Sequence, residues 1–234
     1  MAKNVVIISG NIGAGKSTLA KYIDEKESFI CIPEFIDRSW RDHFYVDRKN
    51  YTFYFEKSCL MARVARHITA KKDQGTVFFD RGLIEAREVF VQNSHDEGFL
   101  TFKQMNSYDF ELKEALDHLG RTKEEAPQWM ESIIVYLKTS PEVCFERQRI
   151  RNLNKDNGNE IIPLEYFQRL HEYYEKFMNS LPEIYKKWGL PFSPKVLVID
   201  ASKDISQDQQ YLEQTFKKIT EIIENNKIMA KEIK

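Results

Sequence analysis

The sequence lacks the features that mark secreted and membrane-bound proteins. It has only three cysteines in 234 residues, Cys31, Cys59 and Cys144, and their spacing follows no disulfide or metal-site pattern. This usage is typical of a reducing compartment, and buried packing is the simplest role for Cys31 and Cys144. The apolar stretch before Gly10 is too short for a signal-peptide core, and no apolar run approaches the length of a membrane span. We therefore expect a soluble, cytoplasmic protein that does not enter a membrane.

A strong charge of either sign is also missing. The chain has 35 basic and 36 acidic residues, which gives a net charge of −1 at pH 7. This balance does not favour a nucleic-acid-binding protein or a protein that attaches to membrane surfaces. No internal repeat, low-complexity tract or linker divides the sequence. We predict one α/β domain, residues 1–234, with enough chain for a sizeable core.

The most informative stretch is a glycine-rich turn that follows an apolar run at residues 5–8 and precedes a helical pattern at 19–23. It matches G-x-x-x-x-G-K-[ST] and consists of Gly10, Asn11, Ile12, Gly13, Ala14, Gly15, Lys16, Ser17 and Thr18. Between a strand and a helix, such a turn wraps phosphates with its backbone N–H groups. Lys16 would then reach the β- and γ-phosphates, and the Ser17 hydroxyl would bind Mg²⁺. The stretch predicts a nucleoside-triphosphate site; a glycine-rich turn without a ligand is the alternative.

Five short apolar runs alternate with helical patterns along the chain. This alternation predicts a five-stranded, doubly wound parallel sheet flanked by helices; the runs are residues 5–8, 29–32, 77–80, 132–137 and 196–199. Ligands bind such sheets at the carboxyl ends of the strands. Glu34 follows the second run directly after Pro33, and Asp80 and Arg81 end the third. We expect Glu34 to act as an acid or base, Asp80 to hold Mg²⁺ or its waters, and Arg81 to neutralise a phosphoryl group. Solvated charges at strand exits are the alternative.

Other helical patterns carry charges without an evident role. Residues 51–71 predict a helix whose charged side chains face solvent, because most charges on a helix do. Arg66 is interpreted in this way, and His67 as a surface or hydrogen-bonded histidine. Residues 83–92 predict a further helix, and residues 94–98 a polar loop.

Three arginines precede a polar stretch in the second half of the chain. Arg147 and Arg151 are four residues apart and share a helix face, whereas Arg149 points elsewhere. The polar residues 154–159 follow directly. Arginines that lead into such a stretch predict a lid, at about 147–162, that closes over phosphates. A solvated basic helix is the alternative.

Together these pieces resemble the deoxynucleoside kinase family, which contains deoxycytidine, deoxyguanosine, deoxyadenosine and mitochondrial-type thymidine kinases. The resemblance spans nearly the whole chain and rests on residues 10–18, 32–34, 80–81, 141–147 and 162–171. It implies a P-loop kinase fold with an arginine-bearing lid. It also implies transfer of the γ-phosphate of ATP, with Mg²⁺, to the 5′-hydroxyl of a deoxynucleoside. A homodimer through the helices at 51–71 and 102–119 is a further implication.

The resemblance implies a role for individual residues. Glu34 stands where the family has its general base, which must lie within hydrogen-bond reach of the 5′-hydroxyl. Arg81 would hold that base, Asp80 would be the acid near Mg²⁺, and Tyr45 would contact the sugar 3′-hydroxyl. The remaining correspondences are Arg147, Arg149 and Arg151 for phosphate contacts, Asp204 and Ile205 for adenine contacts, and Glu160 as the nearest candidate for a sugar contact.

The chain also departs from the family pattern. Gly82 replaces a serine, Leu153 replaces a lid arginine, and Trp40 lies one position late for the tryptophan that packs on the base. The first two departures each remove a polar group, whereas Trp40 is still a candidate for the tryptophan that packs on the base. The site is therefore not a copy of the family pattern.

The residues for base recognition give conflicting signals. Glu56 stands where most relatives have a glutamine, and an ionised glutamate only accepts hydrogen bonds. It would suit the two adjacent donors of guanine, whereas a buried, protonated Glu56 would imitate glutamine. Arg63 fits the members that prefer purines and cytosine, but its usual aspartate partner falls on Ala86, as in thymidine-preferring members. The base preference stays open, with a tilt towards deoxyguanosine as the hypothesis.

Two other functions are compatible with the glycine-rich turn. A nucleoside monophosphate kinase of the thymidylate kinase type shares the fold, but a phosphate acceptor needs no strong base such as Glu34. A non-enzymatic nucleotide-binding protein would not need Glu34, Arg81 and the lid arginines together. Both remain alternatives to a deoxynucleoside kinase.

Overall fold

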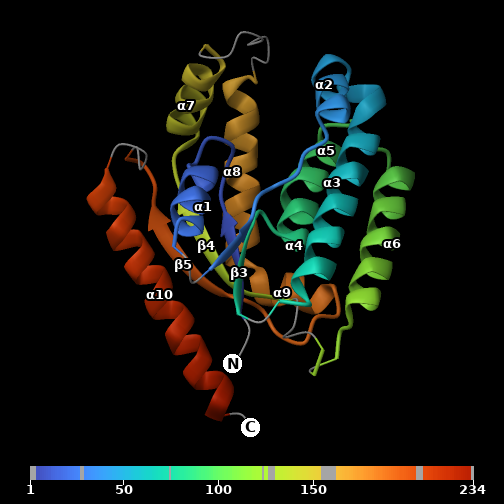
Figure 1. Cartoon of the computed structure of the whole chain (residues 1–234). Helices are drawn as coiled ribbons and strands as arrows, with labels where there is room; N and C mark the ends of the chain where they lie inside the picture. Colours follow the sequence, from blue (N-terminus) through green and yellow to red (C-terminus); the bar gives the residue numbers. More distant parts are fainter. Residues whose placement is uncertain are drawn as a thin grey trace.

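The computed structural model describes residues 4–26, 29–73, 75–122, 124–125, 130–153, 162–203 and 208–232. Figure 1 shows its helices and strands in chain order. They are β1 (Asn4–Ser9), α1 (Lys16–Asp24), β2 (Ile30–Ile32), α2 (Arg38–Val46), α3 (Arg48–Ala70), β3 (Thr76–Asp80), α4 (Leu83–Glu85), the π-helix η1 (Ala86–Val91), α5 (Gln92–Asp96), α6 (Phe102–Leu119), β4 (Glu131–Lys138), α7 (Pro141–Leu153), α8 (Leu164–Asn179), α9 (Leu181–Lys187), β5 (Lys195–Asp200) and α10 (Gln209–Glu232). Within these ranges no helix is long and apolar enough to cross a membrane.

The five strands form one parallel sheet in the order β2-β3-β1-β4-β5. This confirms the α/β fold with a five-stranded parallel sheet. The central strand β1 is buried along its whole length, because helices cover both faces of a sheet of this kind. Ile8 pairs with Asp80 and Ile32 with Phe79. The carboxyl ends of β1, β2 and β3 therefore meet at one edge of the sheet.

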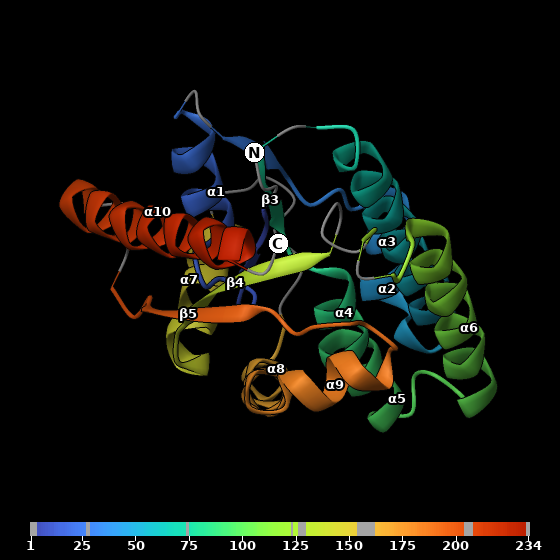
Figure 2. The same ribbon diagram turned by 90° about the horizontal axis from the view of Figure 1, so that it is seen from below.

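The helices form two layers around the sheet (Figures 1 and 2). α1 and α10 contact each other on one face, and α8 and α9 lie on the other. α3 and α6 pack side by side beyond the β2 end of the sheet. At the carboxyl edge, α7 and the start of α8 stand opposite α2 and the start of α3 (Figure 1). The turn between β1 and α1 lies beside α7 and α8 (Figure 1).

The stretch after β3 differs from the sequence-based expectation. The helix predicted at 83–92 is three consecutive segments, α4, η1 and α5, and the last of them continues to Asp96. Residues 94–96 are therefore helical rather than part of a loop. The reason is tertiary, since Asn93 and Ser94 are buried although they are polar. A π-helical segment is rare in proteins and occurs frequently at functional sites.

The sequence analysis did not predict α2. This helix begins after Asp37, whose carboxylate accepts hydrogen bonds from the backbone nitrogens of Ser39 at 2.8 Å and Trp40 at 3.4 Å. An aspartate at this position stabilises a helix because it satisfies unpaired backbone donors. Phe44 is the buried residue of α2. Trp40 stacks on Tyr54 at a centroid distance of 5.5 Å.

Candidate active site

The glycine-rich turn is held from two sides. Gly13 has a φ of 78°, which favours glycine, and a Cβ there would lie 2.5 Å from the carbonyl oxygen of Cys144 in α7. Asn11 donates a hydrogen bond of 2.9 Å to the carbonyl oxygen of Phe167 in α8. The turn is therefore fixed against the two helices that stand over the carboxyl edge of the sheet.

Lys16 is buried at the centre of this turn. Its Nζ donates to the carbonyl oxygens of Gly10 at 3.0 Å and Asn11 at 2.9 Å. Burial and the positive charge of Arg81 lower the pKa of Lys16 to about 8. An anionic group next to Nζ would favour the charged form again. The position is thus suited to a phosphate.

Ser17 and Asp80 bring two oxygen ligands together. Ser17 Oγ donates to Asp80 Oδ2 at 3.0 Å, and Asp80 is buried at the end of β3. The other carboxylate oxygen, Oδ1, is buried and has no hydrogen-bond partner among the residues that the structure describes. Mg²⁺ takes oxygen ligands, one or two of them from carboxylates, together with substrate phosphates. The two side chains fit such an ion.

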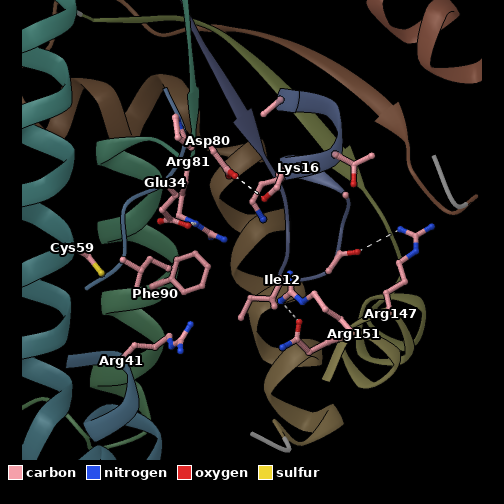
Figure 3. Close-up of a pocket in the computed structure, with 18 of the residues that line it drawn as sticks. Ile12, Lys16, Glu34, Arg41, Cys59, Asp80, Arg81, Phe90, Arg147 and Arg151 are labelled. Carbon is pink, nitrogen blue, oxygen red and sulfur yellow. Dashed lines mark hydrogen bonds and ion pairs between the residues drawn. The ribbon is translucent and has the colours of Figure 1, made fainter. Parts of the chain in front are cut away.

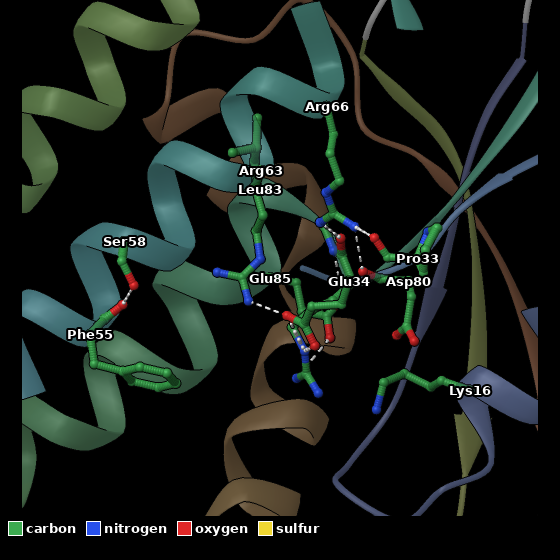
Figure 4. Close-up of polar contacts among 12 residues, drawn as sticks. Lys16, Pro33, Glu34, Phe55, Ser58, Arg63, Arg66, Asp80, Leu83 and Glu85 are labelled. Atoms are coloured by element: carbon green, nitrogen blue, oxygen red, sulfur yellow. Dashed lines mark hydrogen bonds and ion pairs between the residues drawn. The ribbon is translucent and has the colours of Figure 1, made fainter. Parts of the chain in front are cut away.

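Glu34 lies between two arginines just beyond β2 (Figures 3 and 4). Arg63 Nη2 from α3 donates to Oε1, and Arg81 Nε lies 3.4 Å from Oε2. Burial opposes ionisation of this carboxyl group, but the charges of Arg81, Arg63 and Lys16 outweigh it and lower the pKa of Glu34 to about 2. Glu34 is therefore a carboxylate at neutral pH.

Arg81, one of the two arginines next to Glu34, adopts an unusual backbone conformation. Its φ is 71°, the only positive φ outside glycine within the described residues. Its Nη1 donates to the Tyr174 hydroxyl at 2.7 Å, and that hydroxyl donates to Glu85 at 2.7 Å. The guanidinium carbon lies 4.1 Å from the centre of the Phe90 ring. Side chains from α4, η1 and α8 therefore fix the orientation of Arg81.

The space next to Gly82 is filled by Glu131, the first residue of β4. The Glu131 carboxylate accepts hydrogen bonds from the backbone nitrogen of Leu83 at 2.7 Å and from the Tyr185 hydroxyl. Burial raises the pKa of Glu131 to about 7. A buried carboxylate from β4 thus occupies the space into which a side chain at position 82 would extend.

Lys16, Ser17, Glu34, Asp80 and Arg81 line one cleft with a volume of about 1510 Å³. Lys16, Asp80, Arg81 and Glu34 lie close together in it, with Phe90 and Cys59 farther from the turn (Figure 3). Aromatic rings line the region beyond Glu34; they belong to Phe44, Tyr45, Phe55, Phe90 and Tyr166. The cleft therefore has one end with the chemistry to accept phosphates and another end, lined by aromatic rings, that is suited to a flat ring.

Glu56 is the acidic group of the aromatic end. It is only 5% exposed and lines the cleft. Burial raises its pKa to about 7, although the charges of Arg63 and Arg81 act in the opposite direction. Both the protonated and the ionised form are therefore accessible near neutral pH.

Comparison with known proteins agrees with this geometry. A family model described as deoxynucleoside kinase matches residues 6–224. The chain belongs to the deoxynucleoside kinase family. It is 26% identical to a fowlpox virus protein named as a probable deoxycytidine kinase, over 87% of this chain and 81% of the viral protein. It is 26% identical to human mitochondrial thymidine kinase 2, over 91% of this chain and 76% of that kinase. It is 28% identical to the Lactobacillus acidophilus deoxyguanosine kinase, over 85% of this chain and 81% of that kinase.

The arginines of α7 are not equivalent in this kinase. Arg147 and Arg151 line the cleft, and Arg147 Nη1 lies 3.5 Å from the carbonyl oxygen of Gly13 (Figure 3). Arg149 is not a cleft residue, because its exposed side chain forms an ion pair with Glu146 in the same helix. The expected phosphate contact of Arg149 therefore lacks support in this geometry.

One further expectation for the kinase differs from the structure. Ala86 is fully buried in η1 and does not line the cleft, so it does not shape the base site directly. Trp40 does not line the cleft either, and the aromatic rings there come from other residues. Glu160, Asp204, Ile205 and half of the predicted lid, residues 154–161, lie outside the described residues.

Several residues of the site could not be recognised from the sequence. Arg66 was expected to face solvent, but it is 8% exposed and contacts the ends of β2 and β3. Tyr174, Glu85 and Phe90 resemble ordinary residues of amphipathic helices, and only the fold brings them to Arg81. His67 is a buried, hydrogen-bonded histidine, which was one of its two interpretations. Its Nδ1 forms a hydrogen bond of 2.8 Å with the carbonyl oxygen of Arg63.

Proposed function

We propose that this protein transfers the γ-phosphate of ATP to the 5′-hydroxyl of a 2′-deoxynucleoside. The observation that carries the proposal is the position of the Glu34 carboxylate, between Arg63 and Arg81 and in the same cleft as Lys16. A phosphate-binding end and an aromatic end flank this carboxylate. A nucleoside with its base at the aromatic end would place its 5′-hydroxyl near Glu34.

In the reaction, the 5′-oxygen forms a bond to the γ-phosphorus while the bond from that phosphorus to the β–γ bridging oxygen breaks. The proton of the 5′-hydroxyl passes to Glu34. A carboxylate with a pKa of about 2 is a weak base. It is adequate because the transition state of phosphoryl transfer is loose and positioning contributes most of the rate. Arg81 holds Glu34, and Lys16 binds the transferred phosphate.

Ser17 and Asp80 are the residues that would hold Mg²⁺. When bound, the ion neutralises charge on the β- and γ-phosphates. Arg147 and Arg151 would add positive charge from α7. The family resemblance implies a sugar contact for Glu160 and adenine contacts for Asp204 and Ile205. These roles stay predictions.

We also propose that Glu56 takes part in base selection. Ionised Glu56 offers only acceptors and matches the adjacent N1–H and N2–H donors of guanine. Protonated Glu56 offers one donor and one acceptor, as glutamine does. Since its pKa is raised to about 7, the preference for deoxyguanosine should grow as the pH rises through neutrality.

A homodimer through α3 and α6 is the proposed assembly. These two helices lie side by side (Figure 2). Their exposed large apolar side chains are Tyr54, Met61 and Ile68 of α3 and Phe102 and Phe110 of α6. Exposed apolar residues grouped in this way are characteristic of protein–protein contacts.

The test is an assay of the purified protein with ATP and Mg²⁺ against the four natural deoxynucleosides and dTMP. Glu34→Gln is measured alongside, with Glu175→Gln as the control, because Glu175 pairs with Lys138 outside the cleft. We expect deoxynucleoside phosphorylation and a loss of roughly 10²- to 10⁴-fold in Glu34→Gln. Turnover of dTMP alone would establish a monophosphate kinase instead. ATP binding without turnover of any acceptor would establish a nucleotide-binding protein.

A further inference from the structure

Arg66 joins the ends of the two strands that carry the reactive groups. Its Nη1 donates to the carbonyl oxygen of Pro33 at 2.9 Å and lies 3.4 Å from that of Ile32. The same nitrogen lies 3.3 Å from the carbonyl oxygen of Asp80, and Nη2 lies 3.4 Å from that of Arg81. Figure 4 shows the side chain reaching from α3 to this junction. One guanidinium group thus contacts the main chain on both sides of the gap between β2 and β3.

The sheet itself cannot make this connection. The pairing of β2 with β3 stops at Ile32 and Phe79. The next residue, Pro33, has no N–H group and cannot continue the ladder. Without another donor, the carbonyl groups of Pro33 and Asp80 would lack a common partner. Arg66 supplies that partner from outside the sheet.

The junction determines how Glu34 meets Arg81. Glu34 directly follows Pro33, and its Oε2 lies 3.4 Å from Arg81 Nε. The positive φ of Arg81 is costly for a residue with a side chain, so the surrounding structure must maintain it. We propose that Arg66 is a positioning residue for phosphoryl transfer, whose contacts with the main chain on both strands fix Glu34 relative to Asp80 and Arg81. This inference rests on the kinase reaction proposed above.

The chemistry of the junction requires an arginine. Several carbonyl oxygens lie around one planar group, and arginine has five N–H donors in a fixed fork. Lysine carries the same charge, but it has a single nitrogen and a different reach. The guanidinium carbon also lies 5.4 Å from the centre of the Phe79 ring, which adds a contact to its flat face. Charge alone should therefore restore only part of the function.

The experiment compares Arg66→Met and Arg66→Lys with wild type and with Lys71→Met. Lys71 follows α3 and donates from Nζ to the carbonyl oxygen of Leu119 at 2.8 Å, and neither residue lines the cleft. Lys71→Met is a matched control, because this variant also loses a cation that binds a main-chain carbonyl group. For each protein we would measure kcat, the KM of ATP and of the deoxynucleoside, the thermal unfolding midpoint, and the pH dependence of kcat.

We expect Arg66→Met to lower kcat about 100-fold, the usual cost of a small displacement of reacting groups, with a much smaller change in the KM of ATP. Arg66→Lys should recover part of this loss. In Arg66→Met an acid limb of the kcat profile should appear at higher pH than in wild type, because Glu34 is no longer held against its arginines. Lys71→Met should keep the wild-type kcat and pH profile at temperatures where it is folded.

Equal kcat and coincident pH profiles for Arg66→Met and Lys71→Met would overturn the proposal and leave Arg66 a purely structural residue. The same holds if the loss in Arg66→Met disappears at temperatures well below its unfolding midpoint. A wild-type protein without kinase activity would instead overturn the proposed function, and the role of Arg66 with it. The wild-type assay therefore separates the two failures.

Discussion

The Cβ position of Gly82 lies 2.5 Å from Oε1 of Glu131. The φ of Gly82 is −92°, which any residue can adopt, so the glycine is required by space and not by backbone conformation. The carboxylate cannot move aside freely, because Leu83 N and the Tyr185 hydroxyl both bind it. A side chain at position 82 would therefore collide with a carboxylate that is held in place.

Gly82→Ala and Gly82→Ser should both destabilise the protein. We expect the free energy of unfolding to fall by about 1–3 kcal/mol, the range for overpacking a buried site, as measured by urea denaturation. In the background of Glu131→Ala, the additional cost of Gly82→Ala should be much smaller, since the clashing carboxylate is gone. Additive costs in this cycle would contradict the steric explanation.

The ionisation of Glu34 should depend on Arg63. In the wild type, the low pKa of Glu34 predicts that kcat has no acid limb due to this group between pH 5 and 8. Arg63→Met removes a positive charge that favours the carboxylate, so the pKa of Glu34 should rise and an acid limb should appear at higher pH than in wild type. Initial rates across this range test the prediction. Profiles of the same shape in both proteins would show that Arg63 does not control Glu34.

Glu56 should make the stability of the protein depend on pH. Its pKa is about 7 in the folded protein and 4.5 as the ordinary value, so the folded state holds the proton longer than the unfolded state. Glu56 therefore contributes at most about 3 kcal/mol to the free energy of unfolding. This contribution is complete below pH 4.5 and is lost as the pH rises through 7. Glu56→Gln should therefore stabilise the protein at pH 8 relative to wild type and much less at pH 5. Chemical denaturation at both pH values measures this difference.

The same variant tests base selection. Wild type should show a rising ratio of deoxyguanosine to thymidine activity between pH 6 and 8, because ionised Glu56 matches the donors of guanine. Glu56→Gln should have a lower ratio that no longer rises. The measurement is kcat/KM for each nucleoside at each pH. An unchanged ratio in Glu56→Gln would remove Glu56 from base selection.

Arg147 and Arg149 should differ in their effect on catalysis. Arg147 lines the cleft, so Arg147→Met should lower kcat/KM for ATP about ten- to hundred-fold, the equivalent of a hydrogen bond to a charged group. Arg149→Met should cost far less, because the side chain is exposed and pairs only with Glu146 within the described residues. Equal losses would show that α7 moves and brings Arg149 to the phosphates.

The proposed dimer has its own test. Phe110→Glu places a charge on the exposed face of α6, and Met61→Glu does so on α3. If this face is the interface, both variants should sediment as monomers at concentrations where wild type is dimeric, since a buried unpaired charge is costly. A wild-type monomer, or a dimer that tolerates both changes, would place the interface elsewhere.

The sequence by itself determined the sheet and the phosphate-binding turn. The signals for both are local: continuous apolar runs mark buried parallel strands, and the spacing of glycines, Lys16 and Ser17 fixes the turn. Glu34, Asp80 and Arg81 could be proposed because each lies at the carboxyl end of a strand or within two residues of it. Their adjacency in sequence to a predictable element made their place in the fold predictable.

Only the tertiary structure decided the rest of the site. Charges on a helix give no sign of burial, so Arg66 was misread as a solvent-facing residue, although it closes the junction of β2 and β3. Glu131 meets Gly82, and Tyr174 meets Arg81, across 49 and 93 positions of the chain. Such contacts depend on which helix covers which strand, and no periodicity along the sequence contains that information.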